Sequence, residues 1–140
     1  MRRLLNHVLV FGSLAQAALC FVVAMSASSS ADQQGAVRAH DVFFTLNDST
    51  PETRKALVDA CETYLTGHEG TVFFAAGTRT TELTRDVNDT DFDVSLHIYF
   101  EDEAAHELYQ KHPRHAEFIE KMKDNWKTVR VFDSWVKTSP

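Results

Sequence analysis

The sequence predicts a single α+β domain in which an antiparallel sheet has helices on one face, preceded by an N-terminal segment of different character. Three observations lead to this prediction. The chain has 140 residues, which is enough for one ordinary domain. Its content of 44% hydrophobic and 11% aromatic residues is typical of a packed protein. After the N-terminal segment, stretches with the two-residue repeat of strands alternate with stretches that have helical spacing.

The first 31 residues have the three parts of a secretory signal peptide. Arg2 and Arg3 precede an uncharged, largely apolar run over residues 8–25, and small residues follow it. We expect cleavage between Ala24 and Asp32, and therefore an exported protein, periplasmic or extracellular. A retained membrane anchor is the alternative, because about 18 apolar residues barely span a bilayer. The membrane is then a partner only through this segment.

A linker over residues 32–38 and a domain over residues 39–137 are expected to follow. Cleavage removes Cys20 and leaves Cys61 alone, so the exported chain can form no internal disulfide. The formal net charge is −6 and no basic cluster is present. Because binding to phosphate requires concentrated Lys and Arg, we expect no nucleic-acid partner.

The first half of the domain reads as strand, helix, strand. Residues 40–46 form a short β-branched and aromatic run, hence a strand. A helix start follows, with Ser49 and Glu52 as a capping box or Thr50 as the cap before Pro51. Apolar residues then recur at helical spacing up to Gly67, and the stripe contains Leu57, Cys61, Tyr64 and Leu65. This spacing predicts that Cys61 is buried.

The second half reads as strand, strand, helix pair, strand. A strand is expected at residues 71–77, followed by a polar connection over 78–90. Its carboxylates Asp86, Asp89 and nearby Asp91 are consistent either with a hard-cation site or with a solvated loop. Strict alternation then predicts a strand over residues 91–100, with the odd and even positions on opposite faces. The even positions, Phe92, Val94, Leu96, Ile98 and Phe100, are expected to share one face.

Two helices and a last strand complete the pattern. The first helix covers residues 101–112 and ends because the residue before Pro113 avoids helical geometry. A second helix begins at Pro113, and the last strand is expected at residues 128–136. This order predicts a ferredoxin-like split βαβ sandwich with four antiparallel strands. Its uncovered sheet face would expose Phe43, Val72, Phe74, Tyr99 and Phe132 or their neighbours. We therefore expect a homodimer that packs sheet against sheet.

The motifs "HDVFFTLND", "DVSLHIYFED", "YQKHPRHAEFIE" and "VRVFD" occur in this order over residues 40–137. With them the chain resembles the stress-responsive A/B barrel (Dabb) family. The tyrosine followed by His-Pro-x-His is the most specific part. The resemblance implies a dimeric α+β barrel. The family includes proteins known through stress induction and a cofactor-free polyketide cyclase, olivetolic acid cyclase, so membership fixes no single activity.

The resemblance also suggests a site. The catalytic histidine of the cyclase corresponds to His115, its tyrosine to Tyr109, and a pocket histidine on the first strand to His40. A further pocket histidine of the cyclase corresponds to Val94. The remaining wall is expected to be apolar, since these residues lie on the same side as His40: Val42, Phe44, Val94, Leu96, Ile98 and Phe118.

Three hypotheses about function follow. The first is a non-enzymatic dimeric barrel that binds a small apolar ligand or acts in stress. The second is a cofactor-free cyclase or isomerase, in which His115 is a general base and Tyr109 donates a hydrogen bond to an enolate. The third is a monooxygenase-like enzyme, for which the sequence offers no haem ligand.

The histidines also have a structural interpretation. His112 and Pro113 would join two helices, and His115 would bind a neighbouring carbonyl. We expect no metal and no cofactor. Pro113 breaks the spacing of His112 and His115 as ligands, and His68, His97 and His106 lie on other elements.

Overall fold

A computed structural model describes residues 35–138 of the chain; the expected signal peptide and its cleavage site lie outside this range. Within it, no helix is both long and apolar enough to cross a membrane. The elements follow in the order β1 (Ala36–Leu46), α1 (Pro51–Leu65), β2 (Thr71–Thr78), β3 (Val94–Phe100), α2 (Glu103–Lys111), α3 (Pro113–Met122) and β4 (Trp126–Lys137).

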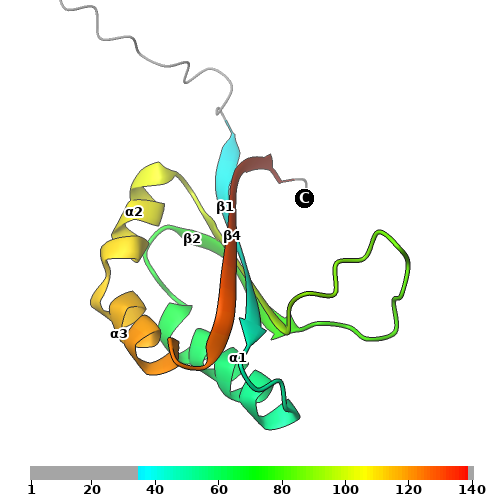
Figure 1. The fold of residues 1–140 in the computed structure, drawn as a ribbon. Coiled ribbons are helices and arrows are strands. Elements are labelled where there is room, and N and C mark those ends of the chain that lie inside the picture. The colour runs from blue at the N-terminus through cyan, green and yellow to red at the C-terminus, as the bar shows by residue number, and fades with distance from the viewer. Residues whose placement is uncertain (1–34, 139–140) are drawn as a thin grey trace, which may run out of the picture.

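The four strands form one sheet in the order β2-β3-β1-β4, and all neighbouring strands are antiparallel. β3 is inserted between β1 and β2, which therefore run parallel to each other. The three helices lie on one side of the sheet (Figure 1). The predicted fold class, a ferredoxin-like split βαβ sandwich with helices on one face, is confirmed.

β1 is longer at its start than the sequence predicted. Residues 36–38, expected as the end of a linker, belong to the strand. Ala36 pairs with Lys137 and Val37 with Val136, so the extended end of β4 fixes their conformation. Tertiary pairing of this kind leaves no local sequence signal.

β3 is shorter than predicted and begins at Val94. The Asp93 carboxylate accepts a hydrogen bond from the Leu46 N–H at 2.8 Å, which turns the chain before the strand. Phe92 consequently packs edge-on against Phe43, with ring centroids 5.0 Å apart. Its predicted place on the same face as Val94 was therefore wrong.

Side chains cap the helix ends close to the residues that the sequence indicated. Thr50 caps α1, and its partner in the capping box is Thr53, so the Ser49–Glu52 alternative was wrong. His112 ends α2 and caps α3, where its Nδ1 accepts a hydrogen bond from the Arg114 N–H at 3.1 Å. This is the structural role that the sequence suggested for His112 and Pro113.

The two sheet faces differ in their cover. Between the sheet and the helices lies the core of buried side chains, which includes Val42, Leu96 and Cys61. The other face, here called the open face, presents Asp41, Phe43, Phe73, His97, Tyr99 and Phe132. Phe74 was expected here but lies opposite Ile98 and packs against the core, so its neighbour Phe73 takes the open position.

The connection between β2 and β3 extends away from the helices (Figure 1). Arg130 of β4 binds it, donating to Asp89 Oδ2 at 2.8 Å and to the Asp91 carbonyl at 2.8 Å. The hydrogen bond from Arg130 lowers the pKa of Asp89 below its ordinary value. Because Arg130 already balances the charge of the Asp89 carboxylate, these contacts favour the solvated loop over a hard-cation site.

Candidate functional site

A cavity of about 360 Å³ lies between the sheet and the helices. This volume is at the lower end of the range for small-molecule sites. The opening lies between α3 and β4, where Ile119, Val129 and Val131 are apolar but 37–48% exposed. The wall is mainly apolar and is completed by Val42, Phe44, Leu65, Leu96, Phe118 and Trp126.

Aromatic side chains form one part of this wall. The rings of Phe44, Phe118 and Trp126 contact one another, with centroids 5.2 to 6.3 Å apart. Such a cluster offers flat apolar surface to a ligand. The polar lining residues gather elsewhere and are linked to one another: His40, Tyr109, Gln110, His115 and Asp133.

His115 lies beside Tyr109 at the polar part of the cavity, with ring centroids 4.6 Å apart. Its Nδ1 is 3.2 Å from the Gln110 carbonyl oxygen. A carbonyl only accepts hydrogen bonds, so Nδ1 carries the proton and Nε2 carries the lone pair. Burial lowers the pKa of His115, which favours this neutral form. His115 thus satisfies a carbonyl and keeps a proton acceptor.

Tyr109 is 2% exposed, and burial raises its pKa above the ordinary value. The phenol therefore stays protonated and can donate a hydrogen bond. Among residues 35–138, no group forms a hydrogen bond with the Tyr109 hydroxyl, so this hydroxyl is available to a molecule in the cavity. On its other side, Tyr109 contacts His68, with ring centroids 5.0 Å apart.

His40 faces the same cavity from β1. Its Nδ1 lies 2.8 Å from Asp133 Oδ1, and the two residues are directly paired between β1 and β4. Because a carboxylate accepts, the Nδ1–H donates to it and Nε2 is left without a proton in neutral His40. The His40 ring is 5.9 Å from that of Tyr109. His40, Tyr109 and His115 therefore converge on one cavity.

The six predicted wall residues divide into two groups. Val42, Phe44, Leu96 and Phe118 line the cavity. Val94 and Ile98 are fully buried in the core and are not among its lining residues. The alternation of β3 placed them on the correct face, but other side chains cover them.

Sequence reasoning did not find two residues of the site. Asp133 joins His40 through the antiparallel register of β1 and β4, which only the folded sheet defines. His106 packs against His40 with ring centroids 5.0 Å apart, and burial lowers its pKa. The signal available for His106 was its position three residues before Tyr109, on the same face of α2.

The fold and the cavity define an α+β sandwich protein with a histidine-lined internal site. The sequence of residues 39–136 matches the Stress responsive A/B Barrel Domain (Dabb). The chain belongs to this family. No curated protein sequence matches it.

Solved structures share the fold at low sequence identity. A dimeric ferredoxin-like protein of unknown function from Thermobifida fusca is 17% identical, with 74% of this chain and 93% of that chain covered and a TM-score of 0.62. A Dabb family protein from Mesorhizobium loti is 20% identical, with 74% and 99% covered and a TM-score of 0.59. A hydroxynitrile lyase from Passiflora edulis is 15% identical, with 76% and 99% covered and a TM-score of 0.60.

Proposed function

We propose that this protein is a dimeric barrel that binds a small, mainly apolar molecule with one polar group. The observation that supports this is the division of the cavity into an aromatic part and a linked polar part. Phe44, Phe118 and Trp126 would contact the body of the ligand. Tyr109 and His115 would exchange hydrogen bonds with a carbonyl or hydroxyl group, since one donates and the other accepts.

A screen of small phenols and aromatic ketones tests this proposal on the full chain. Binding would be followed by NMR shifts of the histidine ring protons. Val129→Trp should block the opening and abolish the shifts, because Val129 lines it. Val87→Trp is the matched control, since Val87 is 87% exposed on the distant loop. Shifts that survive Val129→Trp, or that vanish equally in the control, would place binding elsewhere.

We further propose that two copies associate through the open face. Phe73 and Phe132 are 48% and 53% exposed there, and apolar exposure of this kind is typical of an interface. Asp41 and His97 bind each other at 2.5 Å on the same face, so these polar groups already have partners. The fold relative from Thermobifida fusca is described as dimeric, which supports the association of two copies.

A cofactor-free acid/base enzyme is the second candidate, favoured by the pairing of His115 with Tyr109. His115 Nε2 would remove a proton from a carbon next to a carbonyl. The Tyr109 hydroxyl would donate a hydrogen bond to the resulting enolate oxygen, and the imidazolium would return the proton at the end. The hydroxynitrile lyase from Passiflora edulis shares the fold, so an enzyme can be built on it.

Exchange of the α-protons of an aromatic ketone in D₂O tests the second candidate. Tyr109→Phe and His115→Gln should each slow the exchange, and Tyr109→Phe keeps the ring that fills the core. His97→Gln on the open face is the control. Exchange at the rate of free solution for the unmodified protein would leave ligand binding as the function.

Export is proposed as well, on the N-terminal pattern. Fractionation of the cells that make the protein tests it. The chain should be found outside the cytoplasm, and the alternative of a retained anchor would place it in the membrane fraction.

A further inference from the structure

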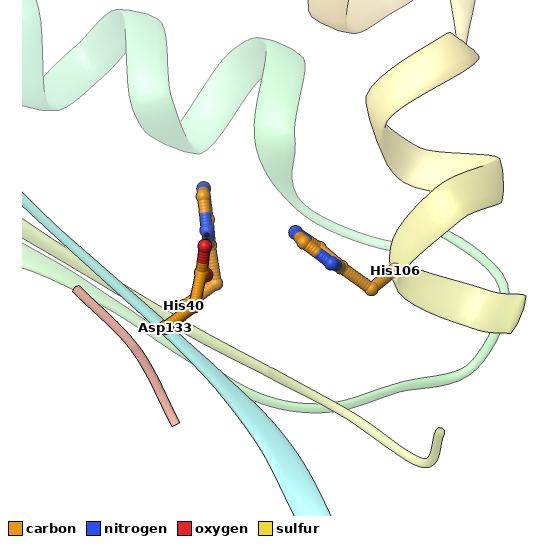
Figure 2. Close-up of side chains that lie close together, drawn as sticks. All are labelled: His40, His106 and Asp133. Carbon is orange, nitrogen blue, oxygen red and sulfur yellow. Dashed lines mark hydrogen bonds and ion pairs between the residues drawn. The ribbon is translucent and has the colours of Figure 1, made fainter. Parts of the chain in front are cut away.

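Three side chains of the types that can bind metal ions come from three separate elements and meet beside the cavity. His40 comes from β1, His106 from α2 and Asp133 from β4 (Figure 2). One ligand atom from each residue can be chosen so that all three lie within 4.8 Å of one another. Two imidazoles and a carboxylate are the protein ligands of many zinc and iron(II) sites.

Each histidine of this group keeps one ring nitrogen available to a ligand. His40 and His106 are 5% and 7% exposed as whole residues, and none of their ring nitrogens is among the described buried polar atoms that lack a partner. His40 Nδ1 binds Asp133, and His106 Nε2 is 3.0 Å from the Gln110 amide nitrogen. Within residues 35–138, neither His40 Nε2 nor His106 Nδ1 has a hydrogen-bond partner.

The spacing is close to that of a bound ion. Ligands at 2.0–2.1 Å from a tetrahedral zinc are roughly 3.3 Å apart. The widest pair of the group must therefore approach by at most roughly 1.5 Å. The Asp133 side chain is 34% exposed, so it has room to turn toward an ion if it gives up its hydrogen bond to His40 Nδ1. Gln110 is also exposed, so its side-chain amide can move away from His106 Nε2 if that ring nitrogen is the one that binds the ion.

The charges around the group allow a cation. Besides His40, Arg38 is a nearby basic side chain that lowers the pKa of His106, and it is paired with Glu103 at 3.3 Å. Asp133 adds a negative charge directly at the group. Because His40 and Asp133 also line the cavity, an ion held here would border it.

From this geometry we propose that His40, His106 and Asp133 bind one divalent transition-metal ion, of the class of Zn²⁺, Co²⁺ or Fe²⁺. Mg²⁺ and Ca²⁺ are not expected, because they require oxygen ligands. The proposal revises the sequence-based expectation of no metal. It does not depend on the binding of an organic ligand, so the two proposals can fail separately.

Titration of the full, untagged chain with Zn²⁺ tests the proposal, and Co²⁺ gives a visible absorption band that reports inner-sphere ligands. We expect one tight ion per chain. Loss of a partner at a metal site typically weakens affinity by about 10- to 100-fold, so His106→Leu and Asp133→Asn should each weaken Zn²⁺ binding at least about 10-fold. They should also alter the Co²⁺ spectrum.

His97→Gln is the matched control. His97 and Asp41 form a second histidine–carboxylate pair, which lies on the open face and has no third ligand in the group. This variant should bind Zn²⁺ within about twofold of the unmodified chain. His7 lies outside the described residues and is present in the unmodified chain and in every variant, so it does not affect the comparison of their Zn²⁺ affinities.

The proposal is overturned if Asp133→Asn and His106→Leu bind Zn²⁺ as tightly as the unmodified chain. It is also overturned if His97→Gln weakens binding equally, because the ion is then adventitious. Asp133 is exposed, so its variant should fold normally, as circular dichroism will show. If His106→Leu fails to fold, Asp133→Asn decides the outcome.

Discussion

Phe132→Ala should weaken the proposed dimer by about two to three orders of magnitude. Phe132 is 53% exposed on the open face, which leaves about 100 Å² of a phenylalanine side chain of roughly 200 Å² for burial. At about 25 cal/mol per Å², and with alanine retaining part of the contact, each copy loses about 1.5–2 kcal/mol. A two-fold dimer contains the residue twice, so about 3–4 kcal/mol is lost, equivalent to a 100- to 1,000-fold higher Kd.

Sedimentation velocity over a range of concentrations measures this Kd directly. Leu108→Ala is the control, because Leu108 is similarly exposed, at 59%, but lies on α2 away from the open face. It should leave the Kd unchanged. A stable monomer of the unmodified chain at micromolar concentration would refute the reasoning, as would equal effects of the two substitutions.

Four further outcomes are expected. Burial raises the pKa of Cys61 to about 12, so a thiol reagent should label the native chain far more slowly than the denatured one; equal rates would place the thiol at the surface. Gly70→Ala should cost about 2–4 kcal/mol in unfolding experiments, because the residue has a φ of +74° and the added Cβ would overlap Ala105. Gly67→Ala, with a φ of +67° and open space, should cost only about 1 kcal/mol. Burial lowers the pKa of His115, so the folded chain resists protonation of this histidine more than the unfolded chain does. The folded state therefore loses stability as pH falls below about 6.5. The unmodified chain should therefore lose more thermal stability between pH about 8 and 5.5 than His115→Gln does; equal losses would contradict the shift. N-terminal sequencing of the exported chain should give a start within residues 25–32, and recovery of Met1 would contradict cleavage.

Much of the fold follows from local signals in the sequence. Strict alternation over residues 94–100 can only place one side of a strand in the core, and the structure confirms it. Pro113 ends one helix and begins the next because its ring excludes helical geometry in the preceding residue. The helical stripe that contains Leu57 and Cys61 is buried as expected. These features depend on residues within a few positions of one another.

The site could be predicted in part. Tyr109 and His115 are close in sequence, and the motif that contains them indicated their common location. His40 was added by family resemblance, since no local pattern links the first strand to α2. For Phe92 the local pattern gave the wrong face. The alternation in the sequence is regular there, but the strand begins only after Asp93, whose carboxylate accepts a hydrogen bond from the backbone of β1.

The sequence by itself determined the strand and helix order, the buried thiol and the exposed aromatic face. Only the tertiary structure decided that Asp133 lies opposite His40 and that His106 packs against both the sheet and Tyr109. The physical reason is register. A shift of one residue between β1 and β4 would turn Asp133 to the other face, and this register is set by all the pairings of the sheet together.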